Sequence, residues 1–185
     1  MDTVVTEAWT ADGFLAWEDK QDGKHEFDGR AVVAMTGGTV AHQRIVFNLC
    51  LTLMGLLDQR PLTAVQEMRV RTATTVRYPD VVICAAPLDQ TSRTLTDAVA
   101  IFEVLSDDTA TTDRVEKLIE YATLPSLRCY VLLEQTEIAA TLFHRESGGP
   151  WIASAHTGGI VFLAGPDITL PMAELYRGLT FSPRA

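Results

Sequence analysis

Two stretches of the chain combine a continuous apolar run with one acidic side chain. Residues 99–106 (VAIFEVLS) are apolar and rich in β-branched residues, except for Glu103 in the middle and a terminal serine. A run of this length and composition predicts a central strand that is buried on both faces. Residues 80–84 (DVVIC) repeat the pattern, with Asp80 opening the strand directly after a proline. Because a buried carboxylate is costly unless it is compensated, we expect each acid to be neutralised, paired or bound to a cation.

The remaining pattern predicts one mixed α/β domain over residues 1–185. Apolar residues recur at helical spacing over residues 40–57, which predicts a long helix. An Asp-Gly pair between two apolar segments predicts a hairpin of residues 25–27 and 30–35. Shorter helices are predicted over residues 10–19 with Thr10 as N-cap, 113–123 and 172–178. Further strands are predicted over residues 62–65, 68–71, 130–134, 139–144, 151–155 and 160–163, and the last three should form an antiparallel meander. Loops are predicted over residues 85–97 and, with a polar composition, over residues 106–112.

Composition restricts the partners and the compartment. The net charge of −9 argues against a broad electrostatic grip on nucleic acid, so any DNA contact would use a local basic patch or depend on divalent ions. No apolar window is long enough to span a membrane, and the N-terminus lacks a signal-peptide pattern. The three cysteines Cys50, Cys84 and Cys129 have no C-x-x-C spacing and lie in apolar contexts. We therefore expect buried free thiols and a cytoplasmic protein.

The two buried acids suggest a shared divalent cation. Mg²⁺ and Mn²⁺ prefer oxygen ligands, and Mg²⁺ is often held by only one or two carboxylates. In this hypothesis Asp80 and Glu103 bind the metal and the carbonyl of Val104 adds a neutral ligand. Lys117, on the helix predicted over 113–123, would face the nucleophile and stabilise developing charge. The alternative is that Glu103 forms a salt bridge with Lys117, Arg114 or another basic residue.

Other polar residues are candidate substrate contacts. His42, near the start of the long predicted helix, could contact a phosphate or serve as a structural histidine. Arg69 and Arg71 share one strand face and, with Arg77, form the best local candidate for phosphate contacts, the alternative being a solvated face. Tyr121 would hydrogen-bond within the site or cap the core. No Ser-His-Asp arrangement, phosphate-cradling glycine loop or zinc spacing is visible.

Six segments, taken together and in order, resemble the Uma-type restriction endonuclease family of the PD-(D/E)XK nuclease superfamily. They are residues 25–30 (HEFDGR), 41–46 (AHQRIV), 78–82 (YPDVV), 103–106 (EVLS), 113–121 (DRVEKLIEY) and 130–132 (YVL). The resemblance implies a restriction-endonuclease-like core, with a central mixed β-sheet flanked by helices. It also implies that Asp80 and Glu103 are metal ligands, that Glu26 contributes an acidic group, and that a lysine is catalytic.

The sequence departs from the general superfamily pattern at one position. Leu105 stands where the lysine of an E-x-K motif would be, and the family pattern resembles a migrated version in which Lys117 supplies that group. The leading hypothesis is a Mg²⁺- or Mn²⁺-dependent endonuclease that hydrolyses phosphodiester bonds in DNA, with RNA or a small phosphodiester as a weaker possibility. The alternative hypothesis, motivated by Leu105 and the negative charge, is a catalytically silent binding or assembly module with a nuclease fold. By analogy with related nucleases, a homodimer is a candidate assembly, although nothing in the sequence fixes it.

Overall fold

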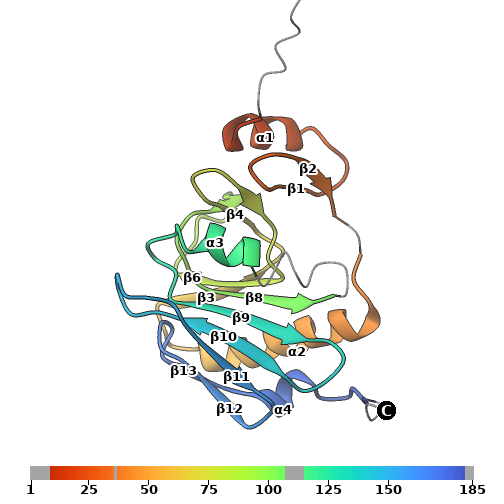
Figure 1. The fold of residues 1–185 in the computed structure, drawn as a ribbon, viewed down its shortest axis with the longest axis vertical. Coiled ribbons are helices and arrows are strands. Elements are labelled where there is room, and N and C mark those ends of the chain that lie inside the picture. The colour runs from red at the N-terminus through yellow and green to blue at the C-terminus, as the bar shows by residue number, and fades with distance from the viewer. Residues whose placement is uncertain (1–8, 36, 107–114, 182–185) are drawn as a thin grey trace, which may run out of the picture.

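The computed structural model describes residues 9–35, 37–106 and 115–181. Figure 1 shows the arrangement of its helices and strands. In chain order these are α1 (Ala11–Glu18), β1 (His25–Phe27), β2 (Val32–Ala34), α2 (Val40–Leu56), β3 (Leu62–Gln66), β4 (Arg69–Arg71), β5 (Val76–Arg77), β6 (Val81–Ala85), β7 (Thr94–Leu95), β8 (Ala98–Leu105), α3 (Lys117–Tyr121), β9 (Cys129–Glu134), β10 (Ala140–His144), β11 (Ile152–His156), β12 (Ile160–Leu163), β13 (Ile168–Pro171) and α4 (Met172–Leu175).

A six-stranded mixed sheet forms the centre of the fold. Its strand order is β11-β10-β9-β8-β6-β3. The apolar run around Glu103 is β8, an interior strand that pairs with β6 antiparallel and with β9 parallel. The strand predicted to begin after Pro79 is β6, and its first four residues are fully buried. The predicted mixed α/β class with a central mixed sheet is therefore confirmed.

Different elements cover the two faces of this sheet. On one face, α2, α4 and the two-stranded sheet β12-β13 pack against alternate residues of β8, including Phe102 and Val104. On the other face, Ile101 and Leu105 pack with side chains of α3 and of the five-stranded sheet. Glu103 lies between Ile101 and Leu105 in this alternation, so its side chain points to the second face.

The second sheet carries the N-terminal elements and has the strand order β2-β1-β5-β4-β7. Helix α1 begins after Thr10, whose hydroxyl accepts the Gly13 N–H at 3.0 Å, as predicted for an N-cap. The helix packs on this sheet through Phe14, which stacks on Phe27 with ring centroids 5.6 Å apart. Strands β1 and β2 form the predicted hairpin.

Three short strands were not predicted. Strands β5 and β7 have two residues each, and β7 lies in the segment expected to be a loop; strands of that length carry no readable period. Strand β13 pairs with β12, while β10 and β11 extend the central sheet, so the C-terminal strands are antiparallel but divided between two sheets.

The last helix is shorter than predicted, and residues 107–114, which include the start of the helix predicted over 113–123, lie outside the described residues. The three cysteines are free, and no helix in the described residues could cross a membrane.

Burial of β8 should dominate the stability of the fold. Replacing the fully buried Phe102 with Ala removes a large core side chain, which we expect to lower the free energy of unfolding by about 3–5 kcal/mol. The matched control is Phe162→Ala on β12, where the ring is 56% exposed, and we expect a change within about 0.5 kcal/mol. Urea unfolding followed by circular dichroism measures both. Equal losses in the two variants would contradict the role assigned to β8.

Candidate active site

The pairing of β6 with β8 brings Asp80 and Glu103 to adjacent positions. The register pairs Val81 with Phe102 and Val82 with Ile101, so extending it by one residue places Asp80 opposite Glu103. Opposed residues of antiparallel strands have Cα atoms about 4.5–5.5 Å apart. The backbone N–H of the next residue, Val104, donates to Asp80 Oδ2 at 2.6 Å. The two acids therefore project from neighbouring positions at one end of the sheet.

Helix α2 supplies a partner for Asp80. His42 lies in the first turn of α2, where its N–H donates to the N-cap Thr39 at 3.1 Å. Its Nε2 is 3.0 Å from Asp80 Oδ1, and both side chains are mostly buried. Burial alone would lower the pKa of His42, but the hydrogen bond and charge of Asp80, together with a backbone hydrogen bond to Val104, raise it above its ordinary value. The protonated form of His42 is thus favoured by the same carboxylate that was predicted to hold a metal.

Helix α3 supplies the partners of Glu103. Lys117 Nζ donates to Glu103 Oε1 at 2.9 Å, and the Tyr121 hydroxyl donates to the same oxygen at 3.3 Å. All three residues are buried. Burial, and then the charge of Glu103, raise the pKa of Tyr121 well above its ordinary value, so this hydroxyl remains a donor. The Glu103–Lys117 ion pair is present, and it places the ammonium group directly against the predicted metal ligand.

The N-terminal sheet adds a second acid to Lys117. Glu26 on β1 has its Oε1 3.8 Å from Lys117 Nζ, and this oxygen also accepts the Tyr78 N–H at 2.9 Å. Its other oxygen lies 3.2 Å from Arg77 Nη1. Arg77 in turn binds Glu120 of α3 through two hydrogen bonds of 2.8 and 2.6 Å. The buried Arg77 guanidinium therefore links β1 to α3, the helix that carries Lys117.

Arg77 is charged under all ordinary conditions. Burial alone would lower its pKa, but hydrogen bonding and charge from Glu120, and then the charge of Glu26, raise it. Its side chain is only 4% exposed, so the guanidinium is directed inward rather than toward solvent. Glu120 was not among the predicted site residues. The three-residue spacing of Lys117 and Glu120 on one helix was the available signal that they share a face.

The other two predicted phosphate contacts, Arg69 and Arg71, lie in β4 and are paired with acids of the N-terminal segment. Arg69 binds Glu18 at 2.8 Å and Asp19 at 2.6 Å, and Arg71 binds Asp12 at 2.7 Å. These arginines therefore dock α1 against the second sheet. A phosphate contact by either guanidinium would have to compete with these ion pairs.

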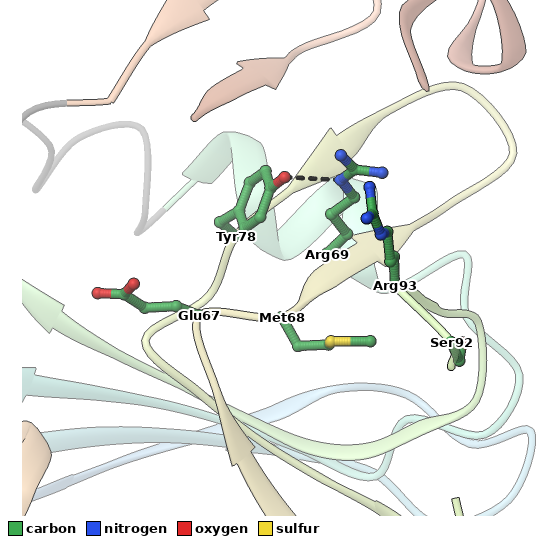
Figure 2. Close-up of a pocket in the computed structure, with 6 residues that line it drawn as sticks. All are labelled: Glu67, Met68, Arg69, Tyr78, Ser92 and Arg93. Carbon is green, nitrogen blue, oxygen red and sulfur yellow. Dashed lines mark hydrogen bonds between the residues drawn. The ribbon is translucent and has the colours of Figure 1, made fainter. Parts of the chain in front are cut away.

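Arg69 also lines a small open pocket beside the site. The pocket has a volume of about 210 Å³. Figure 2 shows its lining side chains and the hydrogen bond from Arg69 Nε to the Tyr78 hydroxyl, whose length is 2.6 Å. The lining residues are Glu67, Met68, Arg69, Tyr78, Ser92 and Arg93. Burial raises the pKa of Tyr78 to about 12, with Glu18 acting in the same direction and Arg69 against it. The pocket adjoins the site because the Glu67 N–H donates to the Asp80 carbonyl at 3.2 Å.

The carboxylate and carbonyl oxygens at this site are the type of ligand that a hard divalent cation prefers. No group of three or more His, Cys, Asp or Glu side chains within the described residues has the arrangement of a metal site. Two carboxylates with a backbone carbonyl are nevertheless sufficient for Mg²⁺, which commonly keeps several waters. Glu103 and Glu26 lie against Lys117, Glu26 and Glu120 lie against Arg77, and Asp80 lies against His42.

Comparison with known proteins shows related chains of similar length. Residues 11–177 match the model of the Uma2 family, described as "Putative restriction endonuclease". The uncharacterized protein slr1290 of Synechocystis sp. is 30% identical over 173 residues, which cover 91% of each chain. A second uncharacterized protein of that organism, sll1609, is 27% identical and covers 85% of this chain and 93% of its own.

A solved structure has the same fold. The crystal structure of "a putative nuclease belonging to DUF820" from Anabaena variabilis superposes with a TM-score of 0.71. It is 15% identical in sequence and covers 91% of this chain and 97% of its own. At this identity the likeness establishes the architecture, and the chemistry is argued from the side chains above.

The Asp80–His42 contact predicts a measurable pKa shift. In metal-free protein, Asp80→Asn should lower the pKa of His42, because the charge that favours the imidazolium is lost while the burial remains. Because the pKa is raised in the folded wild type, the contribution of this contact to stability is complete below the ordinary value of 6.5 and is lost as the pH rises through the folded value. An NMR titration of the histidine rings in the presence of a chelator tests this, with His156 on β11 as the unaffected control. An unchanged pKa of His42 would contradict the assignment.

The Arg77 bridge predicts a large loss of stability. Arg77→Ala leaves Glu26 and Glu120 mostly buried without their shared partner, which we expect to cost about 3–5 kcal/mol in urea unfolding. Arg93→Ala is the control, because that side chain is 72% exposed and its contact with Asp19 is long, at 3.6 Å. We expect its effect to stay within about 0.5 kcal/mol. A similar, small loss in both variants would show that the bridge is not structural.

Proposed function

Because the chain belongs to the Uma2 family of restriction endonucleases, we propose that it is a Mg²⁺- or Mn²⁺-dependent endonuclease that hydrolyses phosphodiester bonds in DNA. The observation that supports this proposal is the β6–β8 register, which by extension puts Asp80 opposite Glu103, together with the Lys117 ammonium 2.9 Å from Glu103. Carboxylates beside a buried ammonium are suited to activating a nucleophile and to offsetting charge on a phosphate. The three free cysteines fit a reducing compartment such as the cytoplasm.

In the proposed mechanism, Asp80, Glu103 and the Val104 carbonyl would hold the divalent ion. When bound, such an ion lowers the pKa of a water molecule and offsets phosphoryl charge. Lys117 keeps a positive charge beside Glu103, where it would stabilise the charge that develops on the attacked phosphate. Glu26, 3.8 Å from Lys117, would orient this ammonium and assist as the acidic group implied by the family pattern.

Leu105 is buried against the core on the second face, so it takes no part in this chemistry. Lys117 reaches Glu103 from α3 instead, which supports the proposal that this helix supplies the missing lysine of the E-x-K pattern. A lysine can be relocated in this way because its long side chain needs only to deliver the ammonium to one place.

We divide the predicted substrate contacts into two groups according to the acids that they contact. We propose that His42 contacts a phosphate near the site, because its ring lies on Asp80 and is favoured in the protonated form. We propose that Arg69 and Arg71 bind phosphates by giving up their ion pairs with acidic residues of the N-terminal segment. Tyr121 and Arg77 contact Glu103 and Glu26, so we assign them to holding these two acids in place rather than to direct contact with DNA.

The test is cleavage of plasmid and single-stranded DNA in Mn²⁺ or Mg²⁺. We expect wild-type activity to disappear with a chelator, and Asp80→Ala and Lys117→Ala to lower the rate by about 100-fold or more. The control Lys20→Ala removes an exposed lysine outside the site and should leave the rate unchanged.

Calorimetric titration with Mn²⁺ separates this proposal from a catalytically silent module. A nuclease of the proposed kind binds the ion, and Asp80→Ala weakens that binding; a silent module shows no binding that depends on Asp80. Absent cleavage, or equal cleavage by wild type, Asp80→Ala and Lys117→Ala, would refute the nuclease proposal. A parallel RNA substrate shows whether the substrate class must be revised.

A further inference from the structure

Helix α2 carries two apolar stripes, although only one of them is buried. Ile45, Leu49 and Leu53 are fully buried against the central sheet. The opposite side presents a second line of large apolar residues to solvent. Its members are Val40, Phe47, Leu51 and Met54, which are 84%, 55%, 45% and 72% exposed. Single exposed apolar residues are common, but a continuous line of them marks an interaction surface.

The spacing of this outer stripe is that of a helix–helix seam. Val40, Arg44, Phe47, Leu51 and Met54 follow one another at intervals of four, three, four and three residues. A repeat of this kind lines one side of a helix and is the pattern by which two helices interlock. Arg44 is also exposed, and its aliphatic stem can cover an apolar neighbour while its guanidinium stays in water.

We propose that this outer stripe, defined as Val40, Arg44, Phe47, Leu51 and Met54, is the interface of a homodimer in which two copies of α2 pack antiparallel. The partner is a second copy because the stripe is self-complementary under a two-fold axis. In an antiparallel seam Phe47 of each copy faces Leu51 of the other, and Arg44 faces Met54. The apolar centre of each stripe is then covered by the stripe of the other copy.

The charges select the antiparallel direction. Arg44 lies near the start of α2 and the exposed Asp58 lies just beyond its end. Antiparallel packing brings Arg44 of one copy toward Asp58 of the other, and it opposes the two helix dipoles favourably. Parallel packing would instead place Arg44 against Arg44 and Asp58 against Asp58. This proposal does not depend on nuclease activity, because the stripe lies on the face of α2 away from the sheet.

The first test is the mass in solution of the full chain, measured by sedimentation velocity at micromolar concentrations. A reducing agent is present because the half-buried Cys50 adjoins Leu51 and could form an artificial disulfide. We expect wild type to be a dimer, and Leu51→Glu and Phe47→Glu to raise the dissociation constant by about 100-fold or more, since each places an unpaired charge against an apolar residue of the partner. Ile160→Glu, at a 66% exposed position on β12, is the matched control and should remain dimeric. Circular dichroism verifies that each variant is folded.

The second test is a charge exchange that reads the direction of the helices. Arg44→Glu and Asp58→Arg should each weaken the dimer, and the double variant should recover most of the wild-type affinity. A monomeric wild type, or equal weakening by Leu51→Glu and Ile160→Glu, would overturn the proposed interface. Failure of the double variant to recover would overturn the antiparallel arrangement, and a wild-type mass larger than a dimer would overturn the closed two-fold seam.

Discussion

The constraint that organises this molecule is the burial of a carboxylate in the middle of an apolar strand. Glu103 is 4% exposed and lies between two core residues of β8. A charge in that position is tolerated only when opposite charge and hydrogen bonds surround it. The structure meets this requirement with Lys117 and Tyr121 from α3. The position of α3, the course of β1 and the orientation of Arg77 can all be understood as parts of the arrangement that compensates this one group.

The compensation extends outward in two directions. Lys117 lies between Glu103 and Glu26, and Arg77 connects Glu26 to Glu120 of the same helix that carries Lys117. On the other face, His42 on α2 engages Asp80, the acid opposite Glu103 in the strand register. Both faces of the central sheet therefore contribute charged partners to one place. Members of such a network are coupled, so single substitutions within it are not expected to be additive.

Much of this arrangement could be predicted from the sequence, because it depends on patterns within single elements. The apolar runs of β6 and β8, the helical period of α2 and the Asp-Gly hairpin were readable from residue order alone, and the family resemblance supplied the expected order of the acids. What could not be predicted depends on contacts between distant segments. Arg77 and Glu120 are 43 residues apart, and a two-residue strand such as β5 has no period to recognise. Arg69 and Arg71 alternate as residues of a solvated face would, yet docking of α1 engages both.

The parallel pairing of β8 with β9 has a consequence for where the lysine can come from. Parallel neighbours cannot be joined by a tight turn, so the connection between them must return along one face of the sheet before the next strand begins. Here the returning segment carries α3 across the face toward which Glu103 points. A residue of that crossover is consequently delivered to the carboxylate by the topology itself, whatever occupies the strand two positions after Glu103. Because α3 supplies the ammonium group, the strand can carry an apolar residue at Leu105. The packing of the core at that position and the placement of the ammonium group are therefore separate requirements, and each can change without the other.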